Sequence, residues 1–186
     1  MPFGLKYDSI ENYLKSYGKY IVRQARGILK KHNSTGKLSK SLKYKVIKDK
    51  DGFDIKFYAS KYSAYINKGV SGTRHKRYFI TKDGKRKLSP FSYKNSKGHS
   101  QPPSSALDKW VVRKGLSPRT KGGQFISRKG LNYIIARSIG RKGIPALSFY
   151  TQPLSYSYNV FKKEMVKHFK EDVLKNVKMV SKNLKR

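Results

Sequence analysis

Apolar residues recur at spacings of three and four along the first thirty positions, which is the pattern of one helical face. The repeat lies between Ser9 and Lys31. Asp8 or Ser9 can cap the start of such a helix, and cations crowd its end, where the helix dipole favours positive charge. Its apolar positions are Ile10, Leu14, Tyr17, Ile21, Ala25 and Ile28. The pattern predicts a long N-terminal helix.

The period changes to two after this helix. Apolar and polar residues alternate from Leu42 to Ile47 and again from Phe53 to Ala59. The turn residues Asp49-Lys50-Asp51-Gly52 separate the two runs. Phe53, Ile55 and Phe57 fall on one face of the second run. The sequence therefore predicts an antiparallel hairpin within residues 41–60.

Shorter elements follow. Residues 61–68 favour a helix that ends at Gly69, and residues 78–88 favour a small hairpin that turns at Asp83-Gly84. Residues 94–103 are typical of a mobile loop. The stretch of about 71–101 is basic and poor in aliphatic residues, so we interpret it as a basic hairpin and loop insertion.

Three further helices are predicted toward the C-terminus, over residues 104–114, 131–141 and from about 155 to the end. The last of these is expected to be buried through Phe161, Met165, Phe169, Val173, Val177 and Val180. No internal repeat is present. These elements predict one α+β domain over residues 1–186, with an antiparallel sheet packed against long N- and C-terminal helices.

Charge is the most extreme property of the composition. The chain of 186 residues has 44 Lys and Arg against 10 Asp and Glu, a formal net charge of +34. Hydrophobic residues make up 37%, which excludes a disordered polycation. Such self-repulsion favours contact with nucleic acid or an acidic protein. Lysine far outnumbers arginine, which favours diffuse phosphate contacts over reading of base edges.

Other features of the composition narrow the class of protein. No apolar run approaches the length that spans a bilayer, and the first residues show no signal-peptide pattern. The chain has no cysteine, which suits a reducing cytoplasm and leaves no thiolate metal site. We expect neither membrane contact nor a cofactor.

Patterns for catalysis are weak. The four histidines lie in unrelated segments without ligand spacing. Asp54-Ile55-Lys56 matches half of a metal-dependent nuclease signature, but that site needs a second carboxylate. Asp49 and Asp51 sit in the preceding turn, where they are badly placed to converge on Asp54. We therefore expect that the protein is not an enzyme.

Several segments, in this order, resemble one protein family. Thr35-Gly36-Lys37-Leu38-Ser39-Lys40-Ser41-Leu42 precedes the hairpin, and Tyr62-Ser63-Ala64-Tyr65-Ile66-Asn67-Lys68-Gly69 follows it. Pro102-Pro103 with Leu107, Trp110 and Lys114-Gly115-Leu116 comes next, and then Leu131 to Arg141 with Gly143-Ile144-Pro145-Ala146 and Phe149. This order is similar to the neck, or tail-completion, proteins of long-tailed bacteriophages, the head–tail joining family.

The resemblance implies a structural virion protein made in the host cytoplasm. Such a protein forms a homo-oligomeric ring around the DNA channel between portal and tail. Its partners are other neck, portal-adaptor and tail proteins, together with packaged double-stranded DNA. A ring of such basic subunits needs anions close by.

We expect the basic segment to contact phosphates in the channel, or a neighbouring ring, without base reading. The candidate contact residues are Arg74, Lys76, Arg77, Lys82, Lys85, Arg86 and Lys87. Two alternatives stay open at this point. These side chains can simply point into solvent, and the chain can be a free, sequence-nonspecific nucleic-acid-binding protein. A nuclease that uses Asp54 is a more distant possibility.

Overall fold

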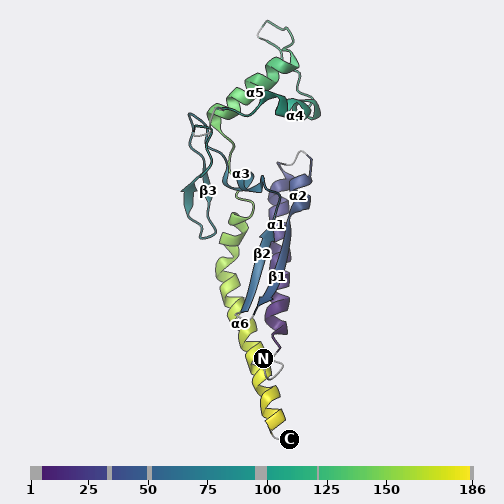
Figure 1. Cartoon of the computed structure of the whole chain (residues 1–186), viewed down its shortest axis with the longest axis vertical. Helices are drawn as coiled ribbons and strands as arrows, with labels where there is room; N and C mark the ends of the chain where they lie inside the picture. Colours follow the sequence, from purple (N-terminus) through teal and green to yellow (C-terminus); the bar gives the residue numbers. More distant parts are fainter. Residues whose placement is uncertain (1–5, 33–34, 50–51, 95–99, 121, 185–186) are drawn as a thin grey trace. The chain divides into compact units, whose positions relative to one another are not determined.

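The structure, a computed structural model, describes residues 6–32, 35–49, 52–94, 100–120 and 122–184. It is 55% helical with two small antiparallel sheets of two strands each, which confirms the mixed α+β class (Figure 1). The chain divides into two compact units. Unit 1 comprises residues 1–60, 82–84 and 149–186, and unit 2 comprises residues 61–81 and 85–148. That the chain is a single domain stays a prediction.

Unit 1 is built from the two long terminal helices and the predicted hairpin. Its elements are α1 (Asp8–Lys30), α2 (Lys37–Ser41), β1 (Lys43–Asp49), β2 (Gly52–Tyr58) and α6 (Thr151–Leu184). β1 and β2 pair antiparallel with Lys43 opposite Tyr58 and Asp49 opposite Gly52. Helix α1 runs alongside both the hairpin and α6 (Figure 1). The predicted hairpin and the two long terminal helices are thus confirmed, and α1 is the helix that packs against the hairpin.

The predicted apolar face of α1 forms the centre of unit 1. Ile10, Leu14, Tyr17, Ile21 and Ala25 are all buried. The Tyr17 ring lies 4.4 Å from the ring of Phe161 on α6. Because these residues repeat every three to four positions, one side of the helix supplies the contact with α6 and the hairpin.

A short helix that the sequence did not predict connects α1 to the hairpin. Gly36 adopts a left-handed conformation with φ 73°, and α2 follows it before β1 begins. Leu38 in α2 and Leu42 directly after it are four residues apart, which brings them close together on a helical turn. Both are buried. The Arg26 side chain donates to the carbonyls of Ser39 at 3.2 Å and Leu42 at 3.1 Å. These bonds hold α2 against α1.

In its C-terminal half, α6 does not turn toward α1 the apolar face that the sequence predicts, although Phe161 earlier in the helix packs on Tyr17 of α1. Phe169 is 51% exposed and Val177 is 60% exposed, whereas Asp172 and Asn176 are buried. The prediction of an apolar buried face on this half of the helix is therefore wrong. Polar bonds between α6 and the start of α1 decide which side of α6 faces inward.

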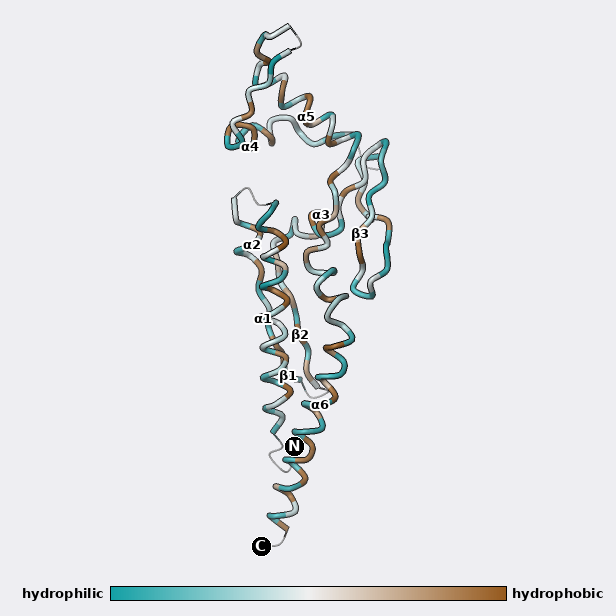
Figure 2. Tube along the Cα trace, turned by 180° about the vertical axis from the view of Figure 1, so that it is seen from behind, coloured by the Kyte–Doolittle hydropathy of each residue, from teal (hydrophilic) through white to brown (hydrophobic). Residues whose placement is uncertain are grey.

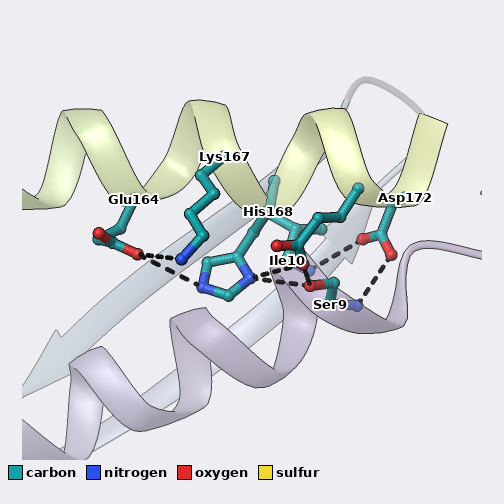
Figure 3. Close-up of polar contacts among 7 residues, drawn as sticks. Ser9, Ile10, Glu164, Lys167, His168 and Asp172 are labelled. Atoms are coloured by element: carbon teal, nitrogen blue, oxygen red, sulfur yellow. Dashed lines mark hydrogen bonds and ion pairs between the residues drawn. The ribbon is translucent and has the colours of Figure 1, made fainter. Parts of the chain in front are cut away.

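Those bonds form a polar clamp between α6 and the start of α1, drawn in part in Figure 3. The Asp172 carboxylate accepts the backbone N–H groups of Ser9 at 3.0 Å and Ile10 at 2.9 Å. Asn176 accepts the N–H of Lys6 and donates to its carbonyl. The first N–H groups of a helix have no partner within the helix, so Asp172 supplies the cap from the other end of the chain.

This clamp corrects the predicted cap of α1. The residue before the helix is Tyr7, and its side chain makes no capping hydrogen bond. Ser9 lies in the first turn instead, where its hydroxyl donates to Glu171 at 2.9 Å and lies 2.8 Å from Nδ1 of His168. The local sequence offers cap residues, but a long-range carboxylate takes their place.

Unit 2 contains the shorter elements. These are α3 (Ser63–Lys68), β3 (Tyr78–Ile80), β4 (Arg86–Leu88), a 3-10 turn (Ser104–Leu107), α4 (Asp108–Arg113) and α5 (Arg128–Lys142). The predicted second hairpin is confirmed, with Tyr78 opposite Leu88. The predicted mobile loop lies partly outside the described residues. That residues 71–101 are an insertion relative to a family stays a prediction.

Tyr150, directly before α6, makes unit 1 less stable at alkaline pH. The Tyr150 hydroxyl donates to the Tyr58 carbonyl at 3.1 Å, and its ring lies 5.7 Å from Phe57. Burial raises the pKa of Tyr150 to about 12, with a smaller opposing effect from Arg26. The folded state therefore holds the phenol proton more tightly than the unfolded chain does, so this contribution is present below pH 10 and is lost as pH rises toward 12.

We expect the free energy of unfolding of the wild type, relative to Tyr150→Phe, to fall between about pH 10 and pH 12. Urea unfolding of both proteins across this range measures the difference. Ionisation of lysine affects both proteins alike and cancels in the comparison. A difference that stays constant with pH would contradict the prediction.

Candidate nucleic-acid interface

Unit 2 is almost free of negative charge. Its sequence has 20 Lys and Arg but a single acidic residue, Asp108. The Asp108 carboxylate is already engaged, because it lies 2.8 Å from Nε of Arg128 and accepts from Nδ2 of Asn132 at 3.1 Å. No carboxylate within unit 2 is left to balance the other cations. This balance favours a polyanion as the external partner.

Residues 72–77, which we call the strap, are hydrogen-bonded to the end of α5. The N–H of Thr73 donates to the Gly140 carbonyl at 2.9 Å, and the N–H of Arg74 donates to that of Arg141 at 3.1 Å. These bonds satisfy carbonyl groups at the end of α5 that have no partner within the helix. A Cβ added to Gly72 would collide with the Arg141 carbonyl. The close approach of the strap therefore needs glycine at this position.

Arg77 also binds the end of α5. Its Nε donates to the Lys142 carbonyl at 2.8 Å, and its backbone N–H donates to the Ser71 hydroxyl at 3.0 Å. The side chain is half-buried, so part of its role is to hold the strap. Arg74 and Lys76, by contrast, are exposed.

The strap brings two residue groups together that are far apart in the sequence. Arg141 and Lys142, at the last turn of α5, are exposed next to the backbone of Arg74 and Arg77. We call this set the basic cluster: Arg74, Lys76, Arg77, Arg141 and Lys142. Our candidate residues did not include Arg141 and Lys142. The sequence does show a basic pair directly before Gly143-Ile144-Pro145 that could have indicated these two residues. The helix dipole also favours cations at the end of a helix, so such a pair does not by itself indicate a binding site.

The other predicted contact residues lie on the second hairpin. Thr81 and Lys85 close its turn through bonds of 2.9 and 3.1 Å. The Arg86 guanidinium lies 4.6 Å from the centre of the Tyr78 ring. Lys87 stands opposite the buried Phe79 and is exposed. Lys82 is exposed in the turn 82–84, which groups with unit 1. The structure therefore divides the seven residues between the strap and this hairpin with its turn.

A second arginine–aromatic pair occurs in a loop of unit 2. Arg119 lies 4.1 Å from the centre of the Phe125 ring, and Phe125 is 67% exposed. Bonds from Thr120 to Gln124 and from Ile126 to Pro118 turn this segment back on itself. The segment therefore presents a cation stacked on an aromatic ring. Such a surface suits contact with phosphates and bases alike.

The structure also bears on the catalytic alternatives. Asp54 is exposed on β2 opposite Ile47, and Asp51 lies outside the described residues. Among the described residues no three His, Cys, Asp or Glu side chains are grouped to hold a metal ion. No described helix is long and apolar enough to cross a membrane.

Ser9 and His168 superficially resemble part of a hydrolytic triad, because Nε2 of His168 lies 3.8 Å from Glu164 (Figure 3). Such a mechanism needs N–H donors for an oxyanion. The N–H groups of Ser9 and Ile10 already donate to Asp172. The arrangement therefore joins α1 to α6, and these two N–H groups are not available to an oxyanion.

Comparisons with known protein families, with curated protein sequences and with solved structures found no match. The residues and their geometry are therefore the basis for assigning a function.

Proposed function

We propose that this chain is a structural subunit of a bacteriophage neck that contacts the DNA backbone without reading its sequence. It assembles into a ring around the DNA channel between portal and tail, and other neck, portal-adaptor and tail proteins adjoin it. The order of the motifs between Thr35 and Phe149 supports the neck assignment. The charge of unit 2 supports the contact with DNA.

One observation carries the DNA contact. The only carboxylate of unit 2 is paired internally, and Asp83 in the turn of the second hairpin balances only one of the cations around it, so phosphates are the anions that offset the remaining cations. The basic cluster and the exposed side chains of Lys85, Arg86 and Lys87 supply the contacts. Lysine ammonium groups act as point charges, and DNA of every sequence must pass through a neck. Contacts to phosphate alone meet that requirement.

A free, sequence-nonspecific nucleic-acid-binding protein is the second candidate, and the same charge balance favours it. Co-purification separates the two. A neck subunit remains with DNA-filled particles through washes at high salt, whereas counterions displace a free binder from DNA. Mass measurement of the protein released from purified particles tests the ring, and finding only monomer there would overturn it.

The hairpin is tested by charge reversal in the phage. Replacing Lys85, Arg86 and Lys87 together by glutamate is expected to cause DNA leakage or failed tail joining, because phosphates and carboxylates repel. Reversal of Lys43, Lys45 and Lys56, exposed lysines of unit 1, is the matched control. Variant particles that assemble, retain DNA and infect normally would remove the hairpin from the DNA contact. The neck assignment would survive that result.

A further inference from the structure

Helix α6 carries two parallel lines of residues, each with a spacing of seven. One line contains Val166, Val173 and Val180, and the other contains Lys163, Lys170, Val177 and Leu184. Each valine of the first line lies four residues before a member of the second line, so the two lines are neighbours on the helix surface. We call this surface the α6 stripe. Figure 2 shows hydrophobic positions continuing along α6 into its last turns.

Unit 1 leaves part of the α6 stripe uncovered, although Val180 is half-buried and Val173 is only 36% exposed. Val166 is 69% exposed and Leu184 is 79% exposed. The inward side of this half of the helix is instead occupied by the polar clamp, through Asp172 and Asn176. A regular apolar stripe on the solvent side of a helix, in register with charged residues, is typical of helix–helix recognition.

A groove adjoins the C-terminal half of the stripe. It has a volume of about 430 Å³. Its lining is Tyr7, Val173, Asn176, Val177, Val180, Ser181 and Leu184. Interfaces between proteins commonly insert an apolar anchor residue into such a recess. The groove therefore supplies a place for a large apolar side chain of a partner.

Charge selects the kind of partner. Between residues 162 and 184, α6 has seven lysines and three acids. All three acids are used within unit 1: Glu164 pairs with Lys167 and His168, Glu171 accepts from Ser9, and Asp172 caps α1. The same helix of a second copy therefore brings no carboxylate for Lys163 and Lys170. An acidic helix brings both apolar contacts and opposite charge.

We propose that the α6 stripe binds an acidic amphipathic helix of another protein. Apolar residues of that helix contact the valines and Leu184, and its carboxylates pair with Lys163 and Lys170. This inference concerns unit 1 and does not rest on the contact of unit 2 with DNA.

The probe is a synthetic fluorescent peptide of three heptads, with leucine at the two apolar positions and glutamate on the flanks. Fluorescence anisotropy with the full chain at physiological salt measures its affinity. A peptide of the same composition with scrambled leucines tests the need for an apolar face. A peptide with lysine in place of glutamate tests the need for opposite charge. We expect only the acidic amphipathic peptide to bind.

Two pairs of variants test the stripe. Val177→Ser with Leu184→Ser removes exposed apolar contacts, and we expect the affinity to fall by about tenfold or more. Lys163→Glu with Lys170→Glu is expected to weaken binding similarly. The matched control is Lys178→Glu with Lys182→Glu, which has the same change in charge at exposed positions outside the stripe. It should keep most of the affinity for the peptide. Val177→Ser with Leu184→Ser should bind DNA as the wild type does, and the two lysine pairs should lose DNA affinity to a small and equal extent.

Other results would overturn the proposal. Equal loss in the control and stripe lysine pairs would show that binding depends only on net charge. Dimers in sedimentation that Val177→Ser with Leu184→Ser abolishes would identify a second copy as the occupant. Peptide binding that appears only after removal of residues 1–5 would identify that segment of the same chain. Absence of binding by any peptide would also refute an acidic helix as the partner.

Discussion

Replacing Asp172 by alanine is expected to lower the free energy of unfolding of unit 1 by about 3 kcal/mol. The carboxylate is only 2% exposed and accepts two backbone N–H groups at the start of α1. Alanine leaves both donors without this partner and removes the negative charge from the positive end of the helix. Urea unfolding followed by circular dichroism measures the loss.

Two further variants separate the cap from general effects of charge. Asp172→Asn keeps an acceptor oxygen but loses the charge, so its cost should be intermediate. Glu171→Gln changes the neighbouring, more exposed carboxylate, which accepts the Ser9 hydroxyl and lies 3.5 Å from Nδ1 of His168, and it should cost less than about 1 kcal/mol. If Asp172→Ala unfolds at the same urea concentration as Glu171→Gln, the clamp does not stabilise α1.

Reversing three charges of the basic cluster is expected to weaken binding to duplex DNA by about a hundredfold at low salt. The variant combines Arg74→Glu, Arg141→Glu and Lys142→Glu. These side chains are exposed, and the strap is held to α5 by backbone atoms and Arg77, so folding should be retained. Each lost phosphate contact should lower the slope of log affinity against log salt by about 0.9.

Two controls accompany this measurement: duplexes of different base sequence, and charge reversal at other positions of the protein. The loss should be the same for duplexes of unrelated sequence, because the contacts are to phosphate. Reversal of Lys43, Lys45 and Lys56 in unit 1 changes the net charge equally and should have a much smaller effect. Equal effects of the two triple variants would show that net charge alone, rather than the basic cluster, governs binding.

The elements with strong periodicity could be predicted from the sequence. Ile10, Leu14 and Ile21 repeat at helical spacing, and Phe53, Ile55 and Phe57 repeat at strand spacing, so α1 and the β1–β2 hairpin follow from local pattern. The charge balance that points to a polyanion is likewise a property of composition. The short helix α2 was missed, because only its packing on Arg26 and α1 distinguishes it from a turn.

The candidate site was predicted in part. The basic residues near the second hairpin and the strap were recognised, because consecutive lysines and arginines are visible in any local window. Arg141 and Lys142 were missed, since their proximity to Arg74 comes from backbone bonds across more than sixty positions of sequence. The partly structural role of Arg77 also depends on those bonds.

The sequence by itself determined that α6 is a helix and that it has an apolar face. Only the tertiary structure decided which face is buried. A helical pattern states which residues share a side, but it does not state what that side meets. The unpaired N–H groups at the start of α1 need an acceptor, and Asp172 on α6 satisfies them, so that polar side faces inward and much of the apolar stripe remains exposed.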